Sequence, residues 1–134
     1  MKIVVDTNII VSALIKEGII RDIILSKDLH LVTVSFTLSE IWKHKEEICE
    51  KAGISLRELF VLLDITFKYI KIINSSFYNE YIKQAKSLIK DIKDVPFLAC
   101  ALALGCPIWS EDKHFDEQDK VKILKTKDII GMVL

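Results

Sequence analysis

The sequence predicts an α/β fold of three layers, α/β/α, in which helices cover both faces of a central, mainly parallel sheet. Short β-branched runs such as Lys2–Val5 alternate with longer segments whose apolar residues recur at helical spacing. The chain has 134 residues, of which 51% are hydrophobic, enough for the core of one domain. It carries no repeat and no Pro/Gly/Ser-rich linker. We therefore expect residues 1–134 to form a single domain.

The elements are expected in a regular alternation. Lys2–Val5 is a buried strand that ends at Asp6, and a helix follows in which Ile9 and Leu14 are apolar and Gly18 ends the helix. The pattern then predicts a helix over 19–27, a strand over 31–34, a helix over 37–53, a helix over Leu56–Tyr69, a strand over 71–73 and an amphipathic helix over 77–89.

The last third of the chain repeats the alternation. A helix over 94–104 has Pro96 in its first turn and Gly105 just past its end, as helices commonly do. Strands over 107–110 and 121–124 and a closing helix over 127–133 complete the prediction.

Charge and cysteine content exclude several classes of protein. The 19 basic and 19 acidic residues cancel, which argues against a polybasic nucleic-acid binder but not against an enzyme that holds phosphate through bound metal. The three cysteines form no CxxC pair, and no histidine lies at zinc-finger spacing from them. No apolar run reaches the ~18 residues that span a bilayer. We expect a cytoplasmic protein with no membrane association.

Two acidic residues follow strands, and a third opens a helix. Asp6 comes directly after a predicted strand, Asp112 comes two residues after another, and Asp94 precedes Val95-Pro96. Ligands of parallel sheets bind beyond the carboxyl ends of the strands. Each of these residues also has an ordinary explanation, as a helix cap or a turn residue.

Glu40 has two competing interpretations. Thr37-Leu-Ser-Glu40 is a capping-box pattern, in which Glu40 would accept a hydrogen bond from the first amide of its helix. The same pattern occurs at Ser55-Leu-Arg-Glu58, which has no functional context. Taken alone, Glu40 is a cap as readily as a ligand.

The four acids together indicate a metal site. They follow a strand, open two helices and follow a strand again, and all of these positions can meet at one edge of the sheet. Carboxylates gathered there repel one another unless a cation is bound. Ligands that are all oxygens favour magnesium or manganese.

Three fragments of the chain resemble the PIN-domain family, the nuclease fold of VapC-type toxins and prokaryotic ribonucleases. IVVDTNII resembles its first strand and acid, TLSEI the helix with its second acid, and KDVPFLACALALGCPIWSEDKHF the stretch with its third and fourth acids. The resemblance implies a PIN-like fold and an Mg²⁺- or Mn²⁺-dependent endoribonuclease. The catalytic and metal-binding residues would be Asp6, Glu40, Asp94 and Asp112, supported by Asn8, Ser110 and Asp91.

The resemblance also implies partners, namely an RNA substrate, a second copy in a homodimer, and an antitoxin protein. A haloacid-dehalogenase-like phosphatase is an alternative, although it needs an acid where Asn8 stands. A non-catalytic module that binds RNA or protein is another. The aromatic residues are expected in the core, with base stacking as the alternative for Trp42: Trp42, Phe97, Trp109 and Phe115.

Overall fold

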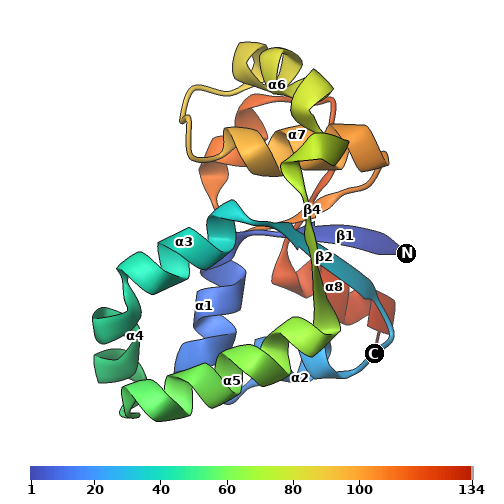
Figure 1. The fold of residues 1–134 in the computed structure, drawn as a ribbon. Coiled ribbons are helices and arrows are strands. Elements are labelled where there is room, and N and C mark those ends of the chain that lie inside the picture. The colour runs from blue at the N-terminus through green and yellow to red at the C-terminus, as the bar shows by residue number, and fades with distance from the viewer. Residues whose placement is uncertain (134) are drawn as a thin grey trace.

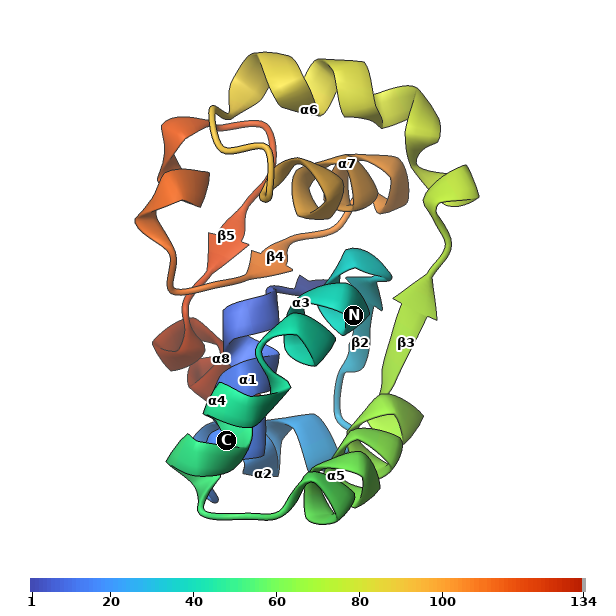
Figure 2. The same cartoon turned by 60° about the vertical axis from the view of Figure 1, so that its left-hand side comes forward.

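A computed structural model describes residues 1–133, and it confirms the three-layer α/β/α fold (Figure 1). The five strands of the central sheet are all parallel, in the order β3-β2-β1-β4-β5. They are β1 (Lys2–Val5), β2 (His30–Val34), β3 (Ile70–Ile73), β4 (Ile108–Trp109) and β5 (Ile123–Leu124). Each lies within a residue or two of the predicted strand. Strand β3 stands at one edge of the sheet (Figure 2).

Helices cover both faces of the sheet (Figures 1 and 2). One face packs against α6 (Ile82–Leu88) and α7 (Val95–Leu104). The other packs against α1 (Thr7–Ile15), α2 (Ile19–Leu25), α4 (Lys45–Ala52), α5 (Leu56–Tyr69) and α8 (Thr126–Val133). Helix α3 (Phe36–Lys43) follows β2 directly, so it begins at the carboxyl edge of the sheet.

Strand β1 contributes side chains to the hydrophobic cores on both faces of the sheet. Ile3 and Val5 face the core that contains α1, whereas Val4 faces the core that contains α7, as the two-residue period of a strand requires. All three side chains are fully buried. Because β1 lies between β2 and β4, its carboxyl end, where Asp6 follows, is at the centre of the sheet edge.

The prediction that Gly18 ends the first helix is wrong. Helix α1 ends at Ile15, and Gly18 precedes α2 with an extended φ of 170°. The side chain of Arg21 takes the place of a glycine cap, because its Nε and Nη2 donate to the carbonyl oxygens of Ala13 (2.8 Å) and Leu14 (3.3 Å). A cation at the carboxyl end of a helix satisfies free carbonyls and is favoured by the helix dipole.

Two predicted helices are divided in the structure. The helix expected over 37–53 is broken at His44 (φ −106°, ψ 18°), which ends α3 and precedes α4. The helix expected over 77–89 is α6 preceded by two 3-10 turns, Ser75–Phe77 and Asn79–Tyr81. The Asn74 side chain accepts a hydrogen bond from Ser76 N (3.0 Å) and so favours the tight turn.

Helices α5 and α7 confirm their predictions. Ser55 and Glu58 form the expected capping box at the start of α5. Gly105 follows α7 in the left-handed conformation (φ 63°), which lets it end the helix. Across residues 1–133, we find no helix with both the length and the apolar character needed to cross a membrane.

Candidate metal centre

The predicted acids line one pocket at the carboxyl ends of the strands. This acid pocket has a volume of about 240 Å³. Its lining includes Asp6, Asn8, Glu40, Asp91, Lys93, Asp94, Asp112 and His114. They reach it from the ends of β1 and β4, from α3, and from the start of α7, segments far apart in the sequence.

Asp6 is held by Ser110. The Oγ of Ser110 donates to Oδ2 of Asp6 at 2.7 Å, and Ser110 is fully buried. Asp6 occupies the N-cap position of α1 without a well-formed side-chain cap hydrogen bond, although the backbone amides of Thr7 and Asn8 lie close enough to lower the pKa of its carboxyl group. Burial raises the pKa of Asp6, the Ser110 hydrogen bond opposes the rise, and the charge of Asp112 adds to it.

Asp112 is joined to the same hydroxyl. Its backbone N donates to Ser110 Oγ at 2.9 Å, and its Oδ1 accepts from the backbone N of His114 at 2.9 Å. The turn interpretation is therefore correct for one carboxylate oxygen, because Asp112 caps the 3-10 helix Lys113–Glu117. Ser110 thus links Asp6 to Asp112 across two neighbouring strands.

Asp94 carries the least satisfied carboxylate. It precedes α7 in the N-cap position without a side-chain cap bond and is only 8% exposed. Its Oδ2 is buried and has no hydrogen-bond partner among residues 1–133. Burial first, then the charges of Asp91, Asp112 and Asp6, raise the pKa of Asp94 to about 6. A buried oxygen in this state fits a cation, which would satisfy it and offset the repulsion.

Glu40 does not form the capping box that its sequence suggests. Helix α3 begins at Phe36, so Thr37 lies inside it, and α3 has no side-chain cap hydrogen bond at its N-cap residue. The Thr37 hydroxyl is instead fully buried, 2.9 Å from Oγ1 of Thr7 and 3.0 Å from Oγ1 of Thr33. This leaves the Glu40 carboxylate free to line the acid pocket. Its Oε2 also lies 3.7 Å from Nε2 of His44, which does not line that pocket.

Sequence reasoning missed His114. Its Nδ1 lies 3.5 Å from Asp94 Oδ2 and 3.6 Å from Asp112 Oδ1. It also lies 3.8 Å from Oδ2 of Asp91, whose Oδ1 accepts from Lys93 N. The available signal was the spacing of SEDKHF, in which His114 follows Asp112 by two residues and precedes an apolar residue, the fully buried Phe115.

The aromatic predictions hold with one exception. Phe97, Trp109 and Phe115 are buried, as expected. Trp42 is 52% exposed and stacks on Phe60, with ring centroids 5.6 Å apart, so its assignment to the core is wrong. Lys45 Nζ lies 4.4 Å from the centroid of the Trp42 ring.

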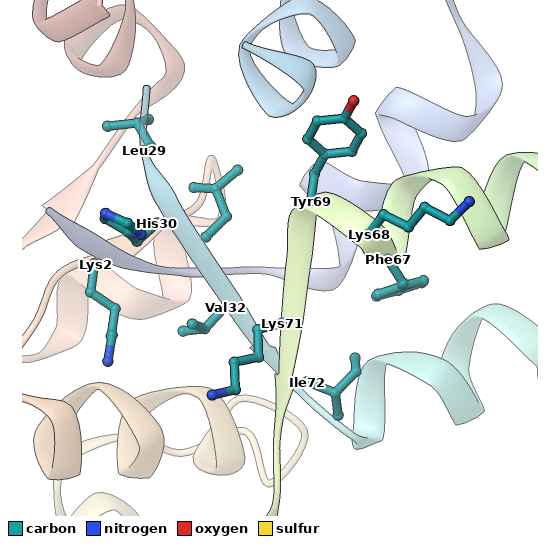
Figure 3. A pocket seen from close by; sticks show the side chains of 10 residues that line it. Lys2, Leu29, His30, Val32, Phe67, Lys68, Tyr69, Lys71 and Ile72 are labelled. Atoms are coloured by element: carbon teal, nitrogen blue, oxygen red, sulfur yellow. The ribbon is translucent and has the colours of Figure 1, made fainter. Parts of the chain in front are cut away.

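A second hollow lies away from the acids. It has a volume of about 610 Å³ and lies along the starts of β1 and β2 and along β3 (Figure 3). Lys2, His30, Lys68 and Lys71 line it together with apolar side chains, and no carboxylate within residues 1–133 does. His30 begins β2, so it lies at the opposite end of that strand from the acid pocket.

Comparisons with known proteins show what the fold of this chain is similar to. The sequence model of the PIN domain family matches residues 4–129. Among solved structures, the crystal structure of VapBC2 from Rickettsia felis bound to a DNA fragment from their promoter is similar, with a TM-score of 0.68 and 20% identity. The match covers 93% of this chain and 98% of that one, and at this identity it shows the fold alone. A comparison with curated protein sequences found no match.

Proposed function

The chain belongs to the PIN domain family, and on that premise we propose that it is a metal-dependent endoribonuclease that hydrolyses RNA phosphodiester bonds. The observation that carries the proposal is the acid pocket, which gathers five carboxylates from distant segments and contains a buried oxygen of Asp94 that has no hydrogen-bond partner among residues 1–133. We propose Asp6, Glu40, Asp94 and Asp112 as catalytic and metal-binding residues, with Asn8, Ser110 and Asp91 in support.

The donor set supports Mg²⁺ or Mn²⁺, because the four proposed ligands all offer carboxylate oxygens. For the third acid, Asp94 is better supported than its neighbour Asp91. Oδ2 of Asp94 is buried and has no hydrogen-bond partner among residues 1–133, whereas Asp91 uses Oδ1 to accept from Lys93 N and is 40% exposed in its side chain.

The bound ion and the residues of the pocket would have separate roles in the reaction. A bound divalent cation supplies positive charge at the phosphodiester and lowers the pKa of an attacking water. Ser110 orients the Asp6 carboxylate through its hydrogen bond. Lys93 lines the pocket and can contact an RNA phosphate. Hydrolysis of this kind leaves a 5′-phosphate and a 3′-hydroxyl.

Cleavage of RNA by the purified chain tests the proposal. Cleavage is expected with Mn²⁺ or Mg²⁺ and should stop in excess EDTA. Asp6→Asn keeps the side-chain shape but removes its charge, so activity should fall by orders of magnitude. Asp28→Asn changes an exposed acid outside the acid pocket and is the matched control. Cleavage by Asp6→Asn at the rate of the control would refute the metal-nuclease assignment.

Measurements of RNA binding and of phosphate release, made beside the cleavage assay, separate the alternatives. A non-catalytic module would bind RNA without cleaving it under any metal. A haloacid-dehalogenase-like phosphatase would release phosphate from small phosphomonoesters, but it needs an acid where Asn8 stands. The nuclease therefore remains the better supported function.

An exposed apolar surface supports the proposal of a homodimer. Five exposed apolar side chains of α3 and α5 lie next to one another and form this apolar patch: Leu38, Trp42, Phe60, Val61 and Ile65. Extended apolar patches of this kind commonly mark interfaces between proteins.

The positions of two charged residues on α5 also support self-association. Arg57 and Asp64 lie symmetrically about Phe60 and Val61, so two antiparallel copies of α5 would pair Arg57 of each copy with Asp64 of the other.

An antitoxin is the second proposed partner. The similar structure from Rickettsia felis is described as VapBC2 bound to a DNA fragment from their promoter. Since the charge symmetry of α5 favours a second copy on the apolar patch, the antitoxin would bind elsewhere. Purified alone, the chain should therefore be a dimer, and a monomer that dimerises only through a second protein would contradict this arrangement.

A further inference from the structure

His114 places a ring nitrogen among three carboxylates of the acid pocket. Nδ1 lies 3.5 Å from Asp94 Oδ2, 3.6 Å from Asp112 Oδ1 and 3.8 Å from Asp91 Oδ2. One ligand atom from each of Asp91, Asp94 and His114 lies within 4.8 Å of the others. The pocket therefore offers an imidazole nitrogen as well as oxygens.

These separations suit ligands that share an ion. Direct hydrogen bonds from ring nitrogen to carboxylate are shorter, about 2.7–3.2 Å. Ligands that lie ~2.1 Å from one ion are roughly 3 Å apart at adjacent octahedral positions and roughly 4.2 Å apart at opposite ones. The three distances from Nδ1 lie between these two values, so small side-chain movements would bring the atoms to positions around one ion.

An independent observation points to a ligand at the same place. The nearest carboxylate atom to the ring is Asp94 Oδ2, the buried oxygen that has no hydrogen-bond partner within residues 1–133. Asp94 as a whole is 92% buried, so water does not readily satisfy this oxygen. An ion between Nδ1 and Oδ2 would give both atoms a partner.

The backbone keeps the ring in position. The backbone N of His114 donates to Asp112 Oδ1 at 2.9 Å, and the next residue, Phe115, is fully buried. The segment that carries the histidine is thus anchored on both sides, while the side chain itself is 57% exposed and faces the acids.

We propose that His114 is a metal ligand of this chain, binding through Nδ1 beside Asp94 and Asp91 and favouring Mn²⁺ over Mg²⁺. The proposal rests on the proposed function and deepens it, because it adds an imidazole nitrogen to the carboxylate oxygens of the metal site. Imidazole adds affinity for first-row transition ions, whereas Mg²⁺ keeps to carboxylate, carbonyl and water oxygens. Only the neutral ring has a free lone pair for an ion.

The chain has three histidines, so replacing each one in turn shows which imidazole binds the ion. Untagged protein loaded with Mn²⁺ is studied by pulsed electron paramagnetic resonance, in which a bound imidazole appears as ¹⁴N modulation. The variants are His114→Gln, His44→Gln and His30→Gln. His44 is the close control, since it lies 3.7 Å from Glu40, and His30 is the distant control, in the hollow of Figure 3. Calorimetric titration with Mn²⁺ and with Mg²⁺ accompanies each sample.

His114→Gln should abolish the ¹⁴N modulation and weaken Mn²⁺ binding by about tenfold, with less than about a twofold effect on Mg²⁺. Both controls should keep the modulation and the affinity. Modulation that persists in His114→Gln, or that disappears only in His44→Gln, overturns the assignment of His114 and leaves the nuclease proposal standing. Wild-type protein that binds neither Mn²⁺ nor Mg²⁺ overturns both proposals, and RNA cleavage by the same samples distinguishes these cases.

Discussion

Ser110 donates a hydrogen bond of 2.7 Å from its Oγ to Oδ2 of Asp6, and the two residues are 104 positions apart in the chain. The same Oγ accepts from the backbone N of Asp112 at 2.9 Å. One buried hydroxyl therefore sets the relative position of the first and fourth acids. It also opposes the rise in the pKa of Asp6 that burial causes.

Ser110→Ala should destabilise the protein without metal by about 1–3 kcal/mol, because it leaves a buried acceptor and a partly buried amide without their partner. The loss should be largest where Asp6 is charged and should shrink as falling pH protonates Asp6. Urea unfolding in EDTA at several pH values measures both effects. Ser110→Thr keeps the hydroxyl and is the control. Equal stability of the alanine variant and wild type would show that the hydrogen bond contributes little.

Two glutamates with the same sequence pattern should behave differently. Glu58 caps α5, since its Oε1 accepts from Ser55 N at 3.1 Å, whereas Glu40 lines the acid pocket. Glu58→Ala should cost about 0.3–1.5 kcal/mol of stability, and Glu40→Ala should cost none in EDTA. Conversely, Glu40→Gln should weaken Mn²⁺ binding and RNA cleavage, while Glu58→Gln leaves both unchanged.

Thermal unfolding and calorimetry on the four variants measure these differences. Loss of stability in Glu40→Ala together with full Mn²⁺ affinity in Glu40→Gln would restore Glu40 to the role of a cap.

The proposed dimer can be tested by exchanging charges on α5. Arg57 and Asp64 are seven residues apart, about 10 Å along the helix, too far to pair within one chain. Arg57→Asp should weaken the dimer by repulsion between copies, and adding Asp64→Arg should restore it. Light scattering during size-exclusion chromatography gives the mass directly.

Phe60→Lys should produce a monomer because it places a charge in the apolar patch. Phe77→Lys changes a side chain that is 69% exposed outside the patch, and it should leave the mass unchanged. A double charge exchange that stays monomeric would exclude the antiparallel pairing of α5.

The sequence predicted those helices best whose ends carry capping residues, prolines or glycines. Helix α7 has Pro96 at its start and Gly105 past its end, and α5 has a complete capping box. The break at His44 has no such signal, because no glycine or proline lies there. The end of α1 depends on Arg21, which donates to carbonyl oxygens from the following helix. A contact of this kind exists only after the two helices have packed.

The sequence predicted the part of the site that follows from the order of the strands in the sheet. Asp6 and Asp112 follow neighbouring parallel strands, so their proximity is a consequence of the sheet. The role of Thr37 was not predictable, because its pattern matches a cap while its hydroxyl is buried against Thr7 and Thr33. His114 was missed because its neighbours Asp91 and Asp94 lie 20 or more residues earlier, and no spacing rule joins them.

Asp94 connects the site to stability. Its pKa in the folded protein is about 6, above the ordinary value of 3.8, so the folded state binds more protons than the unfolded state between these pH values. The stability of metal-free protein should therefore fall as the pH rises from about 4 to about 6 and remain low above that. A pKa difference of this size corresponds to roughly 3 kcal/mol at most.

Asp94→Asn removes this charge, so in EDTA at pH 8 it should melt at a higher temperature than wild type, and the two should converge near pH 4. Mn²⁺ should reverse the order, since an ion that binds only the folded state adds about 2.7 kcal/mol at a hundredfold excess over Kd. Asp91→Asn, with a more exposed carboxylate, should show a smaller change in EDTA. If Asp94→Asn melts lower than wild type in EDTA at pH 8 and Mn²⁺ still raises its melting temperature by the wild-type amount, then Asp94 is a structural residue and its buried oxygen is not a metal ligand.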